Sequence, residues 1–210
     1  MTAWQGSLLT LADDVGPRQP VERGARRALA GGAWVDVHRA WMAGADSLFE
    51  RLAGSVPWRT QRRRMYDRIV DVPRVTAFYD RADELPDPAL AAARAALDRS
   101  YGPELGEPFC TIGLALYRNG DDSVAWHGDT IGRGSREDTM VAILSLGEAR
   151  PLLLRSRIPG KPGTLKYNLG HGDLLVMGGS CQRTWEHAVP KTARPAGPRI
   201  SVQFRPHGVR

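Results

Sequence analysis

The sequence lacks the features of a membrane protein and of a disulfide-stabilised secreted protein. No run approaches the roughly 18 consecutive apolar residues that a membrane-spanning helix needs, and residues 1–5 lack the basic and then apolar order of a secretory signal. Only two cysteines, Cys110 and Cys181, occur in 210 residues. A chain with a core of its own needs no bridge in a reducing compartment. We therefore predict a cytoplasmic protein with no membrane association and with both thiols free.

Internal repeats and low-complexity tracts are also absent from the sequence. A length of 210 residues with 42% hydrophobic content is enough to bury a core in one domain. Residues 1–30 show no sustained periodicity, so we expect a flexible leader there, followed by a single domain at 31–210 that is monomeric. The formal net charge of +6 and the pI near 9.8 would attract a polyanion such as nucleic acid.

The hydrophobic pattern predicts a mainly β protein with flanking helices. Apolar spacing favours helices at 44–52 and 87–102, the second with Asp87 as its N-cap and a proline at its first position. Short β-rich runs separated by Gly or Pro clusters follow the pattern of a double-sheet jelly roll (double-stranded β-helix) covered by helices. The expected strands are 74–79, 111–117, 140–146, 151–155, 165–169, 173–177 and 200–204.

One short motif predicts a metal site. His127 and Asp129 stand two residues apart, which places both side chains on one face of an extended segment. With His187 they would form a facial triad of two histidines and one carboxylate, which leaves positions open on non-haem iron(II). Catalytic zinc is the competing metal at this point. The remaining histidines are expected in the helical front, in a Gly-His-Gly turn and in the C-terminal tail: His38, His171 and His207.

The last β-rich run carries a possible dicarboxylate site. Alternation places Arg199, Ser201, Gln203 and Arg205 on one strand face and the apolar residues 200, 202 and 204 on the other. Guanidinium groups bind carboxylates in a bidentate manner, so this face could bind 2-oxoglutarate. A solvated outer strand face is the alternative.

Segment 59–68 is the densest basic patch and contains five arginines together with Tyr66. Arginines neutralise phosphates, while an aromatic ring can stack on an unpaired base of a single strand or a flipped nucleotide. The alternative is a solvated charged loop.

These residues resemble a known family, the AlkB-like dioxygenases, and in particular the branch that includes the animal DNA-repair homologues. The resemblance covers roughly residues 45–206, and its motifs occur in order along the chain. They are VPW at 56–58, PRVTAFY at 73–79, LYRN at 116–119, DSVAWHGD at 122–129, GDLLVM at 172–177, Gln182, Trp185, HAVPK at 187–191 and RISVQFR at 199–205.

The resemblance implies an iron(II)- and 2-oxoglutarate-dependent dioxygenase that uses O2. It implies iron ligation by His127, Asp129 and His187, and 2-oxoglutarate contacts from Tyr117, Arg199, Ser201 and Arg205. Residues 56–82 correspond to a nucleotide-recognition lid. The expected substrate contacts are Arg62, Arg63, Arg64, Tyr66, Arg74, Tyr79 and Trp126.

The implied activity is oxidative demethylation of N-alkylated bases in DNA, with RNA as the second candidate. In it, 2-oxoglutarate is decarboxylated to succinate and formaldehyde is released, in the repair of alkylation damage. The substrate would be single-stranded or present a flipped base. The alternatives are an oxygenase acting on RNA, a nucleoside or another small molecule, and a nucleic-acid-binding module with a vestigial metal site. Two positions depart from the family pattern: Ala115 replaces an asparagine that contacts the cosubstrate, and Ile131 replaces an acidic residue that reads the base in some members.

Overall fold

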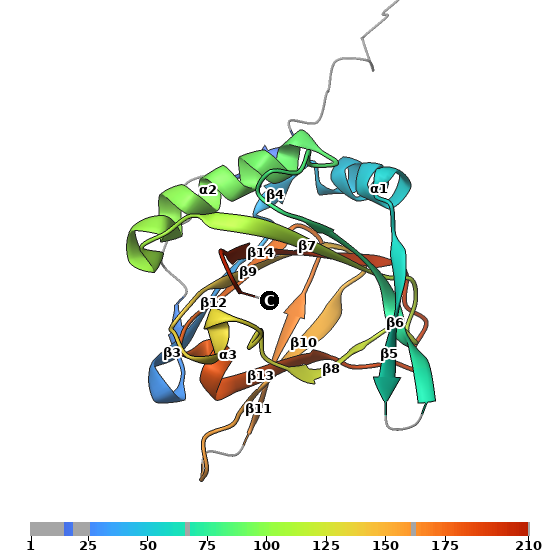
Figure 1. Ribbon diagram of the computed structural model, residues 1–210. Coiled ribbons are helices and arrows are strands. Elements are labelled where there is room, and N and C mark those ends of the chain that lie inside the picture. The colour runs from blue at the N-terminus through green and yellow to red at the C-terminus, as the bar shows by residue number, and fades with distance from the viewer. Residues whose placement is uncertain (1–14, 19–25, 66–67, 161–162, 210) are drawn as a thin grey trace, which may run out of the picture.

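A computed structural model describes residues 15–18, 26–65, 68–160 and 163–209. For residues 61–65 and 68–71 only the backbone is described. These residues form mainly antiparallel strands, with α1 and α2 covering one side of the larger sheet (Figure 1). The helical elements are η2 (Ala30–Gly32), α1 (Ala45–Ser55), α2 (Pro88–Leu105), η3 (Arg133–Ser135) and α3 (Cys181–Thr184).

The larger sheet has eight strands in the described residues, in the order β2-β3-β12-β9-β14-β7-β6-β5. In chain order these are β2 (Arg27–Ala28), β3 (Ala33–His38), β5 (Arg59–Met65), β6 (Arg68–Tyr79), β7 (Phe109–Tyr117), β9 (Val141–Gly147), β12 (Asp173–Gly179) and β14 (Arg199–Pro206).

The smaller sheet has four strands, in the order β11-β10-β13-β8, and it faces the larger sheet (Figure 1). Its strands are β8 (Val124–His127), β10 (Arg150–Ser156), β11 (Thr164–Leu169) and β13 (Trp185–Val189). Two facing antiparallel sheets of this kind form a jelly roll. The mainly β fold with flanking helices agrees with the sequence prediction.

The period-two pattern of β14 divides the molecule into two cores. Ile200, Val202 and Phe204 are fully buried against α1 and α2, in the apolar layer behind the larger sheet. The opposite face of the sheet turns Arg199 and Ser201 toward the smaller sheet. The polar face of β14 therefore lies in the space between the two sheets, as the alternation predicts.

The helix predicted at 87–102 is present and three residues longer, since α2 ends at Leu105. The Asp87 side chain accepts a hydrogen bond from the Ala89 backbone N–H at 2.9 Å, as expected of an N-cap. The helix passes the predicted stop at Gly102 because Gly106, with a φ of 79°, is the left-handed residue that ends it.

The structure corrects the predicted position of His38 and adds strands to those predicted from the sequence. His38 is the last residue of β3 and contacts the hydroxyl of Tyr101 at 2.9 Å, so it does not lie in a helical front. Apart from the two-residue strands, the pattern did not single out β3, β5, β8 and β13 as strands. β13 and β8 are short, and their residues mix polar and apolar side chains, which weakens a period-two signal.

The predicted leader is only partly described. Gly16–Pro17 (β1) pairs with Met42–Ala43 (β4), and Arg27–Ala28 pairs with β3. Residues 1–14 and 19–25 lie outside the described residues. Both cysteines are free, as expected, and both are buried. None of the described helices is long and apolar enough to cross a membrane.

Candidate active site

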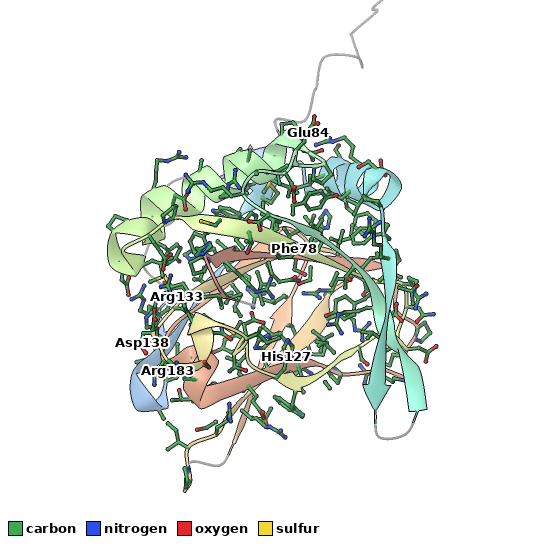
Figure 2. All side chains as sticks on the ribbon, viewed as in Figure 1. Phe78, Glu84, His127, Arg133, Asp138 and Arg183 are labelled. Carbon is green, nitrogen blue, oxygen red and sulfur yellow. The ribbon has the colours of Figure 1, made fainter. Side chains whose placement is uncertain are left out.

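The predicted metal ligands come together between the two sheets. β8 and β13 are paired so that His127 lies directly opposite His187, and their ring centroids are 4.2 Å apart. Asp129 follows two residues after His127, and one ligand atom from each of the three residues lies within 4.8 Å of the others. Figure 2 shows His127 in the space between the sheets. The three side chains can therefore bind one metal ion.

Neighbouring groups orient two of these ligands. The Nδ1 atom of His127 lies 2.8 Å from the Ala125 carbonyl oxygen, a contact that leaves Nε2 for a metal. The backbone N–H of Asp129 donates to Oε1 of the buried Gln182 at 2.9 Å. Gly128 is required between the ligands, since a Cβ there would lie 2.5 Å from the Gln182 carbonyl oxygen. The backbone of the His-Gly-Asp segment is thus fixed against α3.

The electrostatics of the triad favour metal-binding protonation states. Burial alone would raise the pKa of Asp129, but Arg205, which donates to its Oδ2 atom at 3.0 Å, and the two histidines lower that pKa to about 2. Burial, helped by His127, Arg205 and Arg74, lowers the pKa of His187 to about 3 although Asp129 opposes the shift. An ionised carboxylate and a neutral imidazole are the forms that bind divalent metals.

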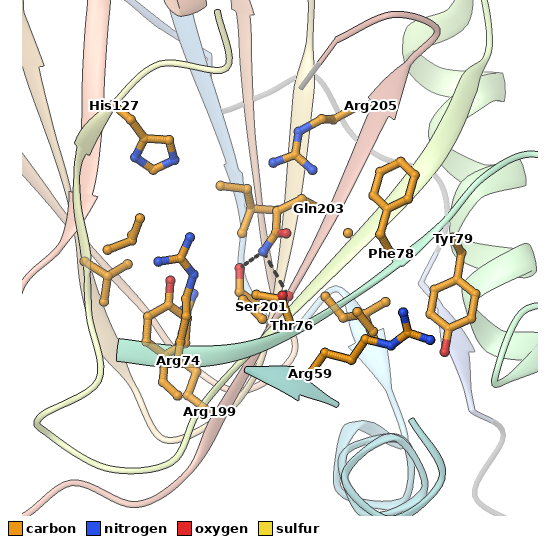
Figure 3. Close-up of a pocket in the computed structure, with 18 of the residues that line it drawn as sticks. Arg59, Arg74, Thr76, Phe78, Tyr79, His127, Arg199, Ser201, Gln203 and Arg205 are labelled. Atoms are coloured by element: carbon orange, nitrogen blue, oxygen red, sulfur yellow. Dashed lines mark hydrogen bonds between the residues drawn. The ribbon is translucent and has the colours of Figure 1, made fainter. Parts of the chain in front are cut away.

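A cavity of about 660 Å³ opens beside the triad. Its walls come from β5, β6, β7, β9 and β14 of the larger sheet and from β8, β10 and β13 of the smaller one. His127 and His187 line it, together with the polar face of β14. Figure 3 shows the labelled side chains of Arg205, Gln203 and Ser201 along one side of this space and His127 across from Arg205. A cosubstrate in the cavity would contact the metal and the arginine strand at once.

Arg199 is the deepest cation in the cavity wall, with 1% of its surface exposed. Its Nε atom donates to the Ser145 hydroxyl at 3.0 Å, and its Cζ atom lies 5.3 Å from the centre of the Tyr117 ring. Its Nη1 atom is buried and has no hydrogen-bond partner among the described residues. Burial lowers the pKa of this guanidinium, because it disfavours the charged form. A carboxylate in the cavity would supply the partner that Nη1 lacks.

Ser201 and Gln203 form a small polar unit beside Arg199. The Gln203 amide donates to the Ser201 hydroxyl at 2.6 Å and to its carbonyl oxygen at 2.9 Å. Ala115 lies opposite Ser201 in the register of β7 and β14 and also lines the cavity. The departure at position 115 therefore falls at the predicted cosubstrate site, where Ser201 and Gln203 are the neighbouring polar groups.

The predicted substrate residues differ in whether they line the cavity. Arg74 and Tyr79 line the cavity. Trp126 does not line it, and its ring contacts Arg155, whose Cζ atom lies 4.4 Å from the ring centre. Residue 131, an isoleucine, is 67% exposed and is not part of the cavity wall. Four predicted contacts lie outside the described side chains: Arg62, Arg63, Arg64 and Tyr66.

Sequence reasoning missed several residues around the site. Arg59, which belongs to the predicted basic segment 59–68 but not to the expected substrate contacts, and Phe78 line the cavity, and Phe78 is 45% exposed. Arg150 is buried and donates to the carbonyl oxygens of Asn119, Asp122 and Pro190 at 2.7–3.0 Å. A lone arginine in an apolar run (residues 150–154) was the only sequence signal for that role.

The comparison with protein families identifies a match over most of the chain. Residues 47–205 match the model described as the 2OG-Fe(II) oxygenase superfamily. The chain is 33% identical over 178 residues to alpha-ketoglutarate-dependent dioxygenase alkB homolog 3 of Bos taurus, covering 77% of this chain and 61% of that protein. It is 26% identical over 196 residues to DNA oxidative demethylase ALKBH2 of Arabidopsis thaliana, covering 76% of this chain and 61% of that one. The chain thus spans about three fifths of the length of these relatives.

Solved structures agree on the fold. A prolyl hydroxylase from Trichoplax adhaerens superposes with a TM-score of 0.58 at 11% identity, covering 82% of this chain and 83% of that chain. The structure of OsALKBH1 superposes with a TM-score of 0.57 at 14% identity, covering 87% of this chain and 100% of that chain. At such identities the likeness shows the fold alone, and it confirms the predicted jelly-roll core.

Proposed function

The chain belongs to the 2OG-Fe(II) oxygenase superfamily and is an AlkB-like member of it, and on this premise we propose that it oxidatively removes N-alkyl groups from nucleic-acid bases, DNA first. In this proposal iron(II) is bound by His127, Asp129 and His187, and 2-oxoglutarate lies in the cavity against Tyr117, Arg199, Ser201 and Arg205. The protein acts in the cytoplasm as a monomer.

The unpartnered Nη1 atom of Arg199 is the observation that carries the cosubstrate assignment. It is buried in the wall of the cavity that the histidines of the triad also line. A cation without a counter-charge in such a place is unfavourable unless a ligand neutralises it. A dicarboxylate could place one carboxylate at the metal and the other at Arg199, where it would be the missing partner of Nη1. A zinc hydrolase would leave the arginine unexplained, which favours iron over zinc.

The bound metal, Arg205 and the polar face of β14 have separate roles in the reaction. Iron(II), when bound, supplies open coordination positions for 2-oxoglutarate and O2. Arg205 keeps Asp129 ionised and oriented, and the strand face of β14 orients the cosubstrate. One oxygen atom of O2 enters succinate as CO2 leaves 2-oxoglutarate, and the other converts N–CH3 to N–CH2OH. Loss of formaldehyde then returns the N–H of the unmodified base.

Nucleic acid is supported as the substrate by two kinds of observation. The relatives are named as an alkB homologue and a DNA oxidative demethylase. The chain carries a net charge of +6, and the described cations at the cavity mouth, Arg59 and Arg74, could contact phosphates. A base reaches a cavity of this kind only from a single strand or after flipping out of a duplex.

Two measurements test the proposal in sequence. Anaerobic addition of iron(II) and then 2-oxoglutarate should produce a weak visible charge-transfer band, while succinate in place of 2-oxoglutarate should not. Mass spectrometry should then detect demethylation of methylated single-stranded DNA with iron, ascorbate and 2-oxoglutarate, together with formaldehyde. Absence of the band contradicts the enzymatic function and favours a nucleic-acid-binding module with a vestigial site. A band without turnover of any methylated DNA contradicts the DNA substrate and directs the search to RNA, nucleosides or other small molecules.

A further inference from the structure

The polar face of β14 contains a glutamine whose side chain turns back onto its own strand. The Nε2 atom of Gln203 lies 2.9 Å from the carbonyl oxygen of Ser201 and 2.6 Å from its hydroxyl oxygen (Figure 3). A carbonyl oxygen only accepts hydrogen bonds, so the group beside it must be the amide NH2 and not the amide oxygen. The two protons of the Gln203 amide are therefore both donated to Ser201.

The neighbouring strand leaves room for this arrangement. In the register of β7 and β14, Gly113 lies opposite Gln203, and Ala115 lies opposite Ser201. A Cβ at Gly113 would lie 3.0 Å from the Gln203 Oε1 atom, so a larger residue there would crowd the amide. Neither small residue offers a polar side chain. In the described part of the chain, Gln203 is consequently the one hydrogen-bond partner of the Ser201 hydroxyl.

The bond from Gln203 sets the direction of the Ser201 hydroxyl. A serine hydroxyl can accept through its oxygen and donate its single proton. Because the oxygen accepts from the Gln203 amide, the proton points elsewhere and is available to a second group. Ser201 is 4% exposed and lines the cavity, so a ligand in the cavity is the natural acceptor of this proton.

The cosubstrate of the proposed function is an acceptor of this kind. Its two carboxylates accept hydrogen bonds and donate none. Under that function it lies along the polar face of β14, between the metal and Arg199, and Ser201 is the next residue of that face after Arg199. A donor that is already oriented binds a carboxylate more tightly than one that must first turn, because less conformational freedom is lost on binding.

We propose that Gln203 is a positioning residue of the cosubstrate site, and that its amide holds the Ser201 hydroxyl as a hydrogen-bond donor to a carboxylate of 2-oxoglutarate. This inference rests on the proposed function. The family resemblance implies a cosubstrate contact for Ser201 and none for Gln203. Gln203 acts through Ser201, since both of its amide protons are already donated to that residue. The site thereby gains a fixed donor where Ala115, on the opposite strand, offers none.

A double-mutant cycle tests the proposal by binding alone. Gln203→Met removes the amide at nearly the same length, Ser201→Ala removes the hydroxyl, and a third variant combines the two. The dissociation constant of 2-oxoglutarate is measured on the anaerobic iron(II) protein from its visible charge-transfer band. We expect a rise of about threefold for Gln203→Met and about fivefold for Ser201→Ala, as for one neutral hydrogen bond. The combined variant should bind as Ser201→Ala does, because the two residues act as a unit.

Gln203→Glu tests the direction of the bond. The substitution puts an acceptor in place of the amide donor, so the Ser201 proton should turn toward the new carboxylate and away from the cosubstrate. We expect the dissociation constant of 2-oxoglutarate to rise at least about tenfold when Ser201 is present. Added to Ser201→Ala, the same substitution should cause a smaller rise, because only charge repulsion remains. An equal rise in both backgrounds would show that the Ser201 hydroxyl does not mediate the effect, and the proposal would be wrong.

Iron affinity without cosubstrate is the control. It should not change in Gln203→Met, because none of the described hydrogen bonds joins Gln203 to the three ligands. A loss of iron affinity would place the action of Gln203 at the metal and overturn the proposal. So would an unchanged dissociation constant in Gln203→Met, or an equal change with and without the Ser201 hydroxyl.

Failure of this inference can be told apart from failure of the proposed function. If the unaltered protein with iron(II) and 2-oxoglutarate gives no charge-transfer band, the proposed function is contradicted, and the role of Gln203 falls with it. A band in the unaltered protein with the same 2-oxoglutarate affinity in every Gln203 variant contradicts the role of Gln203 alone and leaves the proposed function standing.

Discussion

The two ends of the cavity differ in how firmly the fold fixes them. At the metal end, Asp129, His187 and Arg199 are buried, and β14 lies between β7 and β9 in the middle of the larger sheet. At the mouth, Arg59 and Phe78 are exposed, and β5 is the edge strand of the same sheet. Residues at the metal end therefore have one arrangement available, while those at the mouth are constrained by few neighbours.

Because of this difference, the oxidation reaction depends on the metal end of the cavity and the choice of substrate depends on its mouth. Oxidation requires ligands and cosubstrate in one geometry, which the centre of a packed sheet provides. Substrate choice depends on side chains that can change without loss of the fold, and an edge hairpin allows such changes. Substitutions at the metal end should consequently affect every substrate alike, and those at the mouth should change the ratios between substrates.

The largest effect is expected from His127→Ala. The loss of one of three ligands should abolish stoichiometric iron binding and reduce turnover by at least about a thousandfold, while a half-exposed histidine contributes little to the core. Bound iron, 2-oxoglutarate decarboxylation and thermal unfolding check this together. His207→Ala, which changes an exposed histidine in the tail, is the control and should leave all three unchanged. Retained iron and turnover in His127→Ala would remove this residue from the site.

Arg199→Gln should have the next largest effect. It removes the cation opposite the far carboxylate of 2-oxoglutarate, and the KM for 2-oxoglutarate should rise by about 10- to 100-fold, as the loss of a charge-assisted pair implies. Iron affinity without cosubstrate should not change, because Arg199 makes no contact with the triad among the described contacts. Steady-state kinetics at varied 2-oxoglutarate measure the KM, and an anaerobic iron titration measures the iron affinity. An unchanged KM would exclude Arg199 from the cosubstrate site.

The sequence predicts the metal end better than the mouth for a physical reason. His127 and Asp129 are two residues apart on an extended segment, and Arg199 to Arg205 alternate on one strand, so local spacing is enough to place each set on one face. The meeting of His187 with His127 depends on the pairing of β13 with β8, which spacing does not reveal. Assignment of the other three histidines to the helical front, a turn and the tail leaves His187 as the candidate, and the family resemblance implies the same ligand.

Other features required the three-dimensional structure. Trp126 precedes His127 on the same strand, so its side chain points to the opposite face. There it contacts Arg155 and does not line the cavity. Arg150 is the clearest omission, because its partners are backbone carbonyl oxygens in two loops distant in sequence. Backbone partners leave no trace in side-chain patterns, so such a role cannot be inferred from the sequence.

Arg150→Met tests how strongly those loops are joined. The substitution keeps the apolar stem but leaves the carbonyl oxygens of Asn119, Asp122 and Pro190 without their donor, and it should lower the free energy of unfolding by about 3 kcal/mol. Chemical denaturation measures the loss. Arg155→Met is the matched control on the same strand, where an exposed ion pair with Glu186 contributes about 0.5 kcal/mol or less. A similar small loss in both variants would show that the buried arginine does not join the loops.

The smallest effect is expected at the boundary between the metal end and the mouth of the cavity. Gly113 lies opposite Gln203 in the sheet, and a Cβ there would lie 2.9 Å from the Arg205 Nη1 atom and 3.0 Å from the Gln203 Oε1 atom. Both are ends of flexible side chains, so Gly113→Ala should displace Arg205 from Asp129 rather than unfold the chain. Turnover should fall by a few-fold, roughly the effect of a modest steric shift of about 1 kcal/mol.

The control for that substitution is Gly54→Ala in α1, where a Cβ meets nothing within 4 Å. It should leave turnover unchanged and raise the free energy of unfolding by about 0.5 kcal/mol, since alanine favours the helix. If Gly113→Ala lowers turnover equally for every methylated substrate, Arg205 belongs to the metal end. If instead it changes the ratio between substrates, the boundary between the residues that oxidise and those that select lies deeper in the cavity, and the polar face of β14 takes part in both.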